Sequence, residues 1–379
     1  MGKIKIAIIE LETHTQVIKQ WDFLLRNSEV IDVDYFLHSK LKVNLSFLNP
    51  ENSSYCDFNA NSELEGFLSE IPKYDLVIIN TLHRHFEAYA KLFATQKTLC
   101  IVHNPNFSLF HKPISIRNLW DEKSNAFYFL KLFLIEKIRK YQNILFKADF
   151  FGVFSSSIYD EIIKEGTVSE KKLVNISLTY TESVSFEKKL PINIVISGTV
   201  SEKRKDYETV FEMIKKLNPQ HPIVFYFLGR PENSKMEKKL EELSKLEIKN
   251  LEVVHYKKLI PSSEFDKIIQ NSHILLCPVK VKTSFYGVTE FYGKTKISGN
   301  EYDCVRNGKI GLFPTSYPKM NWHNLYYQNG NDLAEMLNNL TLENLEFEYQ
   351  KLQPYIQNYT FENVKNQLEN QLLQLANTK

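Results

Sequence analysis

Short apolar runs alternate with longer amphipathic segments through most of the chain. Apolar runs bounded by polar residues are typical of buried strands, and the amphipathic segments are typical of helices that cover a sheet. Because the two alternate, the pattern predicts parallel, doubly wound sheets. In the first half the predicted strands lie at residues 4–9, 30–36, 75–79, 98–102, 148–154 and 172–176, and the polar stretch 40–61 is predicted to be a loop.

A polar stretch at residues 181–190 interrupts this alternation, which starts again after Pro191. We therefore predict an α/β fold with two Rossmann-like parallel-sheet domains, at residues 1–185 and 186–345, and a helical tail at 346–379. The cleft between two such domains is the expected place for a ligand. In the second half the predicted strands lie at residues 192–197, 223–228, 251–254, 274–277, 310–313 and 325–327.

Composition narrows the class of protein. The 379 residues are 43% hydrophobic and carry a net charge of +2, so no global charge favours nucleic acid as a partner. The four cysteines are scattered and form no metal-ligand spacing, which is typical of reduced core thiols. The first residues enter a strand directly, and no run reaches the length of a membrane span. A cytoplasmic protein is therefore expected.

The segment 116–147 is a candidate for contact with a membrane surface. Residues 116–147 are predicted to be helical, with an apolar core at 126–135 followed by clustered lysine and arginine. A basic amphipathic helix can lie on an anionic membrane, here the inner face of the cell membrane. The alternative is a helix packed on the sheet with an exposed basic end, and the pattern does not decide between the two.

The stretch 284–314 carries the first candidate ligand site. A polar loop follows the strand at 274–277, and a helix is predicted to begin at Ser298, Gly299 and Asn300. Free backbone N–H groups at such a helix start attract phosphate, although a capped surface helix is the plain alternative. Charged residues near it could add contacts to phosphate or to sugar hydroxyls: Lys294, Lys296, Glu301 and Asp303.

A P-loop can be excluded for the same stretch. Gly287 and Gly293 are separated by five residues rather than the four that the motif requires. Two of the intervening residues, Phe291 and Tyr292, are also too bulky for a backbone that wraps a phosphate.

A second anion-binding element is predicted at residues 196–206, where a strand runs into a helix. Gly198 and Thr199 allow close backbone approach to a ligand, and Arg204 and Lys205 stand where the loop enters the helix. A solvated basic turn is the alternative. No Asp-x-Asp pair lies near the cleft loops, so we expect a pyrophosphate to be held without a metal or other cofactor.

These motifs resemble those of GT-B glycosyltransferases, in particular the retaining group-1 type of glycosyltransferase family four. The segment ISGTVSEKRKDY is similar to the opening of their C-terminal domain, which makes Lys205 the phosphate-binding lysine with Arg204 beside it. Their later loop carries two glutamates separated by seven residues. Aligning its glycine with Gly299 puts Asp303 at the second glutamate, which binds ribose, and Thr295 at the first, which contacts the donor sugar.

The resemblance implies further site residues. Glu290 and Glu301 are the two candidates to replace the missing first glutamate. The segment CIVHNP suggests His103 as the histidine that contacts the donor sugar, with His83 as its competitor. The nucleotide base would face the backbone between Tyr256 and Leu259, and the terminal helices, with YTFENV near residue 359, would cross back to the first domain.

The resemblance also implies the activity. It predicts transfer of a hexosyl group from a nucleotide sugar to a glycan or lipid-linked acceptor, with retention of configuration, in cell-surface polysaccharide or glycolipid assembly. The catalytic residues would be His103, Arg204 and Lys205. Two alternatives stay open: a sugar-nucleotide epimerase of the same fold, and a catalytically silent partner protein, which the missing glutamate permits.

Overall fold

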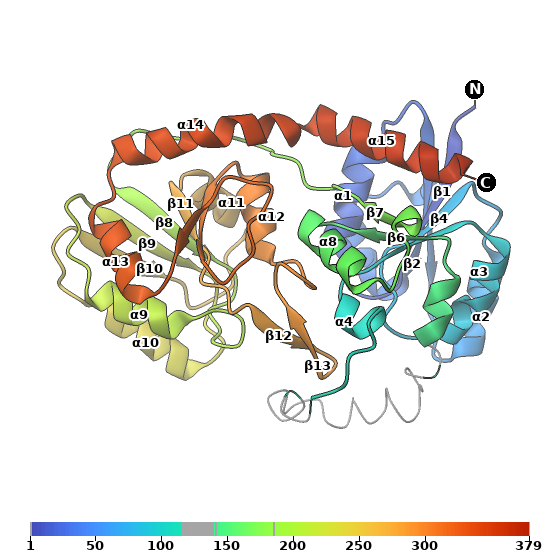
Figure 1. Cartoon of the computed structure of the whole chain (residues 1–379), viewed down its shortest axis with the longest axis horizontal. Coiled ribbons are helices and arrows are strands. Elements are labelled where there is room, and N and C mark those ends of the chain that lie inside the picture. Colours follow the sequence, from blue (N-terminus) through green and yellow to red (C-terminus); the bar gives the residue numbers. More distant parts are fainter. Residues whose placement is uncertain (1, 116–117, 119–139, 141, 185, 379) are drawn as a thin grey trace.

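The computed structural model describes residues 2–115, 118, 140, 142–184 and 186–378 (Figure 1). Most of the predicted helical stretch 116–147, with its membrane-binding role, therefore lies outside the described residues. The end of that stretch forms a 3₁₀ helix, η5 (Gln142–Lys147). Among the helices that are described, none has both the length and the apolar composition needed to cross a bilayer.

The first sheet has seven parallel strands in the order β3-β2-β1-β4-β5-β6-β7. The predicted strands are confirmed, and the extra strand β3 lies in the stretch predicted to be a loop. It was missed because this short edge strand has half-exposed and exposed positions and no apolar run. The strands are β1 (Ile4–Glu10), β2 (Ile31–His38), β3 (Ser53–Cys56), β4 (Leu76–Ile79), β5 (Thr98–Ile101), β6 (Phe150–Val153) and β7 (Leu173–Asn175).

Helices cover both faces of this sheet, because its central strands are buried on both sides. One face packs against α1 (Thr15–Leu25) and α15 (Phe361–Asn377), whose Val364, Leu368 and Leu372 belong to its apolar core. The other packs against α2 (Asn61–Glu70), α3 (Ala90–Thr95) and α8 (Ser156–Glu165). Figure 1 shows α14 (Leu342–Asn358) and α15 running from the second sheet back to the first.

The second sheet has six parallel strands, and each of them was predicted. Their order in the sheet is β10-β9-β8-β11-β14-β15. Its central strands β8 and β11 are neighbours, so the loops that follow them meet at one edge of the sheet. The strands are β8 (Ile192–Ser197), β9 (Ile223–Leu228), β10 (Leu251–His255), β11 (Ile274–Leu276), β14 (Ile310–Pro314) and β15 (Leu325–Tyr327); the helices are α9 (Tyr207–Lys215), α10 (Ser234–Ser244), α11 (Ser262–Gln270), α12 (Gly299–Arg306) and α13 (Gly330–Asn338).

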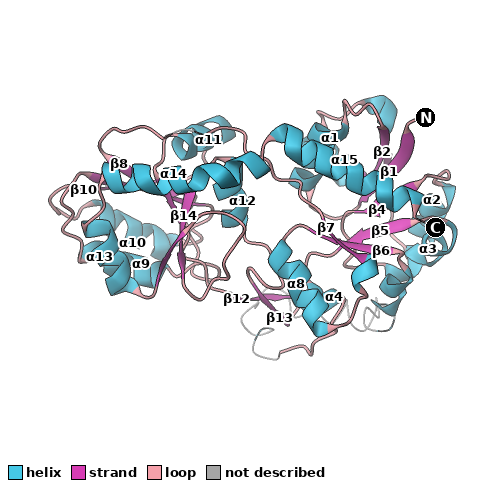
Figure 2. Cartoon of the chain, turned by 45° about the horizontal axis from the view of Figure 1, so that its top comes forward, coloured by secondary structure: helices cyan, strands magenta, loops and turns pink. Residues whose placement is uncertain are grey.

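The loop after β11 contains a β-hairpin that was not predicted, β12 (Lys282–Phe285) with β13 (Val288–Phe291). This clasp hairpin, residues 282–291, leaves the second sheet and packs beside α4 (Pro105–Ser108) of the first domain (Figures 1 and 2). Val288 is completely buried in the core of that domain. Two hydrogen bonds add to the contact: Asn106 Nδ2 donates to Thr289 O at 2.8 Å, and the Phe107 N–H donates to Glu290 Oε1 at 2.9 Å.

Candidate functional site

A cavity of about 450 Å³ lies at the carboxyl edge of the second sheet, and we call it the basic cavity. The loop after β8 and the start of α12 line it, so the structure brings the two predicted anion-binding elements together. Because β8 and β11 are adjacent, their loops converge at this edge. Predicted site residues that line it are Gly198, Thr199, Arg204, Lys205, Ser298, Gly299, Asn300 and Asp303.

The backbone at both walls of the basic cavity suits an anion. Gly198 has a φ of +85°, a conformation that residues with a side chain rarely adopt, and it lies directly after β8. The Ser298 side chain caps α12 by accepting the Asn300 N–H at 3.3 Å. The start of α12 therefore presents its N-terminal N–H groups and positive dipole end at the cavity wall.

Lys205 lies at the floor of the basic cavity. Its buried ammonium donates to the Ser197 carbonyl, and burial lowers the pKa of Lys205 to about 8, with the nearby Asp303 acting in the opposite direction. Asp303 Oδ2 accepts from the Ser197 hydroxyl at 2.5 Å, and Asn300 Nδ2 donates to that hydroxyl at 3.2 Å. Ser197 thus ties the loop that follows β8, residues 198–206, to the start of α12, and we call this loop the basic loop.

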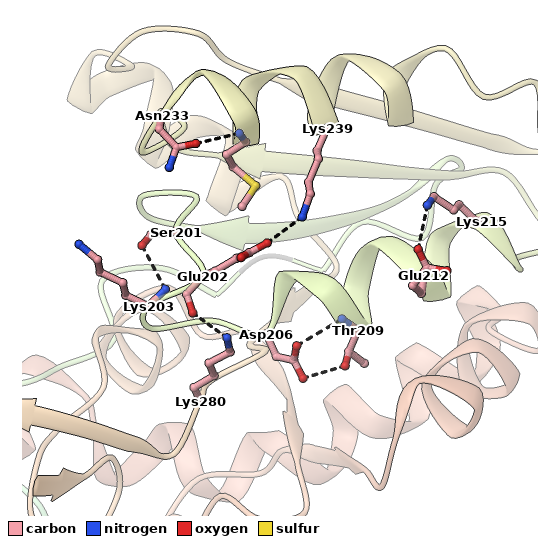
Figure 3. A network of polar contacts seen from close by, with 11 residues as sticks. Ser201, Glu202, Lys203, Asp206, Thr209, Glu212, Lys215, Asn233, Lys239 and Lys280 are labelled. Atoms are coloured by element: carbon pink, nitrogen blue, oxygen red, sulfur yellow. Dashed lines mark hydrogen bonds and ion pairs between the residues drawn. The ribbon is translucent and has the colours of Figure 1, made fainter. Parts of the chain in front are cut away.

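The basic loop is also held from outside (Figure 3). Lys280 Nζ donates to Glu202 O at 2.7 Å, and Lys239 on α10 contacts Glu202 Oε1 at 2.9 Å. Asp206 caps α9 by accepting from the Thr209 N–H at 3.3 Å and the Thr209 hydroxyl at 2.7 Å. Arg204, by contrast, is exposed at the cavity wall. The loop therefore offers a fixed, buried cation, Lys205, and an accessible cation, Arg204, to the same space.

A larger cavity of about 700 Å³ lies between the two domains, and we call it the interdomain cavity. His103 from the first domain and Lys296 and Glu301 from the second line it, all three predicted as site residues. Lys296 Nζ donates to Asn104 Oδ1 at 3.0 Å and lies 5.1 Å from the centre of the Phe285 ring. Residues 296, 297, 301 and 302 thus line this cavity, whereas residues 298–300 between them line the basic cavity.

Three histidines meet on the first-domain side of the interdomain cavity. The rings of His14 and His103 are stacked at 4.3 Å with an interplanar angle of 6°, and His83 lies edge-on to both. His103 Nε2 lies 2.7 Å from Asn80 O, and burial lowers the pKa of His103 to about 3. His103 is therefore a neutral imidazole whose Nε2–H donates to the Asn80 carbonyl and whose Nδ1 can only accept a hydrogen bond.

His14 is a site residue that sequence reasoning missed. It follows β1 at the carboxyl edge of the first sheet, and the polar segment Glu10–Glu12–Thr13–His14 was the available signal. The predicted histidines His83 and His103 follow β4 and β5, and β1 is the next strand in the same sheet, so its end lies at the same edge.

The two glutamates proposed to replace the first family glutamate lie in different surroundings. Glu301 lines the interdomain cavity, accepts a hydrogen bond from the Tyr317 hydroxyl, and has its pKa raised to about 7 by burial. Burial also raises the pKa of Glu290 to about 7, but Glu290 is fully buried in the clasp hairpin. Neither Glu290 nor Thr295 lines either cavity, so of the two candidate glutamates Glu301 is the one within reach of a ligand.

Three predicted residues are not brought to these cavities. Lys294 is exposed and lines neither of them. Tyr256 and Leu259 follow β10 and also line neither, and the Leu259 side chain is 82% exposed. A nucleotide base that contacts the loop after β10 would therefore lie outside the basic cavity.

The two parallel-sheet domains, the cavities at their facing edges and the helices that cross back define the GT-B fold. No protein-family profile matches the chain, and no curated protein matches its sequence. Solved structures do match. A glycosyltransferase from Rickettsia africae superimposes with a TM-score of 0.62 at 11% identity over 100% of both chains.

Two further matches show the range of this fold. HepE from Anabaena, solved with UDP and glucose, has a TM-score of 0.60 at 12% identity, covering 98% of this chain and 100% of HepE. A Listeria monocytogenes protein described as a UDP-N-acetylglucosamine 2-epimerase has a TM-score of 0.56 at 12% identity, covering 98% of this chain and 96% of its own. At such identities the likeness establishes the fold and not the activity.

Proposed function

We propose that this protein is a glycosyltransferase that moves a sugar from a nucleoside diphosphate sugar to an acceptor hydroxyl. The observation that carries the proposal is the convergence of Lys205, Arg204 and the start of α12 on one cavity. Departure of a nucleoside diphosphate leaves negative charge on its β-phosphate, and fixed cations and helix N–H groups stabilise such charge.

The position of the second cavity supports transfer rather than simple nucleotide binding. Because residues 298–300 at the start of α12 line the basic cavity while Lys296 and Glu301 line the interdomain cavity, a sugar attached to a diphosphate there would extend between the domains. Glu301, His103 and Lys296 would then lie near its hydroxyl groups. The volume of about 700 Å³ leaves room for an acceptor as well.

Finer expectations follow from the family resemblance. They are a hexosyl donor, a glycan or lipid-linked acceptor of cell-surface polysaccharide or glycolipid assembly, and peripheral contact with the inner face of the membrane. Retention of configuration also stays a prediction. Donor binding without a divalent metal is supported by the protein cations at the basic cavity and by the lack of an Asp-x-Asp pair near the cleft loops.

A donor screen tests the proposal. Thermal shift with a panel of nucleotide sugars, starting with UDP-glucose because HepE was solved with UDP and glucose, should give at least one stabilising donor, with or without EDTA. Product detection with and without an acceptor then separates the candidate activities. Turnover of donor alone to an isomer would identify an epimerase, and binding without any turnover would identify a silent partner protein. Failure of every donor to bind would contradict the proposal.

Asp303 is expected to select ribose-bearing ligands. Asp303→Asn should weaken UDP binding about tenfold, since loss of one charge-assisted hydrogen bond costs about 1.5 kcal/mol or more. Binding of inorganic pyrophosphate should not weaken, because the variant removes a negative charge near Lys205. Calorimetric titration measures both, with Asp266→Asn as the control, because Asp266 pairs with Arg306 and lines neither cavity. Equal losses for both ligands would contradict the ribose role.

A further inference from the structure

The carboxyl group of Glu301 is held by one of its two oxygen atoms. Glu301 lies in the first turn of α12, and its Oε1 accepts a hydrogen bond from the Tyr317 hydroxyl. Within the described part of the chain, its second oxygen, Oε2, makes no hydrogen bond. Because Glu301 lines the interdomain cavity, Oε2 is the oxygen that remains for a ligand in that cavity.

The Tyr317 side chain is fixed in the interior of the second domain. It follows β14, is 2% exposed, and its ring stacks on Phe313 with the ring centroids 4.8 Å apart. Gly293 has a φ of +78° and packs against the same ring, so that a Cβ atom there would lie 3.1 Å from Tyr317 Cζ and 2.7 Å from Pro318 Cδ. The phenol group therefore has little freedom to move away from Glu301.

The hydrogen atom in this contact belongs to Tyr317. Burial and the neighbouring Glu301 raise the pKa of Tyr317 well above its ordinary value, so the phenol keeps its hydrogen. An ionised carboxyl group can only accept hydrogen bonds, and the phenol donates to it. The contact therefore favours the ionised form of Glu301, and it also sets the orientation of the carboxyl group.

The surroundings of Glu301 oppose its ionisation. Burial raises the pKa of Glu301 to about 7, while the hydrogen bond from Tyr317 acts in the opposite direction. Burial also raises the pKa of each titratable group that faces it, so that these groups are uncharged at neutral pH. They are Cys304 on α12, Tyr317 after β14, Tyr326 on β15 and Tyr359 at the end of α14. Near neutral pH the balance between the two forms of Glu301 therefore depends on the phenol of Tyr317.

We propose that Tyr317 is a positioning residue of the donor-sugar site, which holds Glu301 so that Oε2 accepts a hydrogen bond from a sugar hydroxyl; this inference rests on the proposed function. The sugar is expected there because Asn300, next to Glu301 in the chain, lines the basic cavity where the diphosphate would bind. Without the phenol, Glu301 can rotate and is protonated at neutral pH, so it becomes a weaker acceptor. Tyr317 therefore determines how much affinity the sugar adds to that of the nucleotide.

The hydrogen bond can be tested without any substrate. In protein labelled with ¹³C at the glutamate carboxyl groups, NMR follows the titration of Glu301, whose signal is identified by its absence in Glu301→Gln. The midpoint should lie at about pH 7 in the parent protein. Tyr317→Phe should move it to a higher pH, because the hydrogen bond that favours the carboxylate is lost. An unchanged midpoint in Tyr317→Phe would overturn the proposal.

Calorimetric titration with UDP-glucose and UDP tests the role in sugar recognition. At about pH 7.5, Tyr317→Phe should weaken UDP-glucose binding about tenfold, the loss expected for one hydrogen bond to a charged group. The UDP affinity should stay within about twofold, because UDP lacks the donor sugar. The loss should become smaller toward about pH 9, where Glu301 ionises without the phenol. Glu301→Gln should show a similar loss that does not recover, because its amide does not ionise.

Tyr326→Phe is the matched control. Tyr326 also faces Glu301, but its hydroxyl contacts Asn324 and it lines neither cavity, so both affinities should stay within about twofold of the parent. Three results for Tyr317→Phe would overturn the proposal: no loss of UDP-glucose affinity, an equal loss for UDP, or a loss that persists at high pH. If neither UDP nor UDP-glucose binds to the parent, the proposed function itself fails, while the NMR titration still decides whether Tyr317 holds Glu301.

Discussion

Replacing Lys205 with methionine is expected to weaken UDP binding by one to two powers of ten. Methionine fills the same buried space but removes the cation that lies at the floor of the basic cavity. Loss of one charge-assisted contact typically costs about 1.5–3 kcal/mol, which corresponds to this range of affinities. Isothermal titration of UDP measures the effect. The control is Lys203→Met, because Lys203 is exposed at the same cavity and already pairs with Glu232 at 3.0 Å.

The same lysine predicts a pH effect. Burial lowers the pKa of Lys205 to about 8, so above this pH the side chain is mostly neutral in the free protein. A bound diphosphate favours the charged form and raises that pKa, so UDP binding at pH 8–9 should take up a proton and weaken as the pH rises. Calorimetric titrations in buffers of different ionisation enthalpy give the number of protons that are taken up when UDP binds. Uptake that persists unchanged in Lys205→Met would show that another group is responsible.

Placing a charge in the clasp hairpin is expected to destabilise the whole protein. Val288→Asp loses apolar burial and puts a carboxylate into the core of the first domain, where Val288 is completely buried. The free energy of unfolding should fall by at least about 3 kcal/mol, because the lost apolar burial and the buried carboxylate each cost one to several kcal/mol. Thermal unfolding measures the loss of stability, and small-angle scattering should show a more open average shape as the hairpin leaves α4.

The matched control for this prediction lies in the same hairpin. Lys282→Asp changes an exposed position at the open end of the hairpin, opposite Phe291. Surface substitutions of this kind usually alter stability by no more than about 0.5 kcal/mol. Similar melting temperatures for Val288→Asp and the parent would mean that the hairpin does not join the domains in solution.

The fold could be predicted wherever the sequence carries a local signal. Strands such as β4 and β5 are buried on both faces, so each is a continuous apolar run with polar residues at its end. Strand β3 and the clasp hairpin lack such a run. The hairpin is stabilised by partners more than 160 residues away in the sequence, such as Asn106 and Phe107. Local periodicity does not indicate contacts of this kind.

For the candidate site too, the residues with a local sequence signal could be predicted and the others could not. Lys205 and the start of α12 could be predicted because each follows a strand end, and strand ends of a parallel sheet share one edge. The sequence could not choose between Glu290 and Glu301, because the choice depends on the hairpin, which buries Glu290 away from both cavities. His14 contacts Thr81 at the interdomain cavity, and these two residues are 67 positions apart and meet only in the folded sheet.

The way α15 completes the first domain has a consequence for synthesis of the chain. Val364, Leu368 and Leu372 fill the apolar core beside β1, so this core is incomplete until the last helix has left the ribosome. Roughly 200 residues separate the end of β7 at Asn175 from the end of α15 at Asn377, and their translation takes roughly 10–40 s at about 5–20 residues per second. During this interval the nascent first domain exposes apolar surface, which makes it a substrate for chaperones that act during translation.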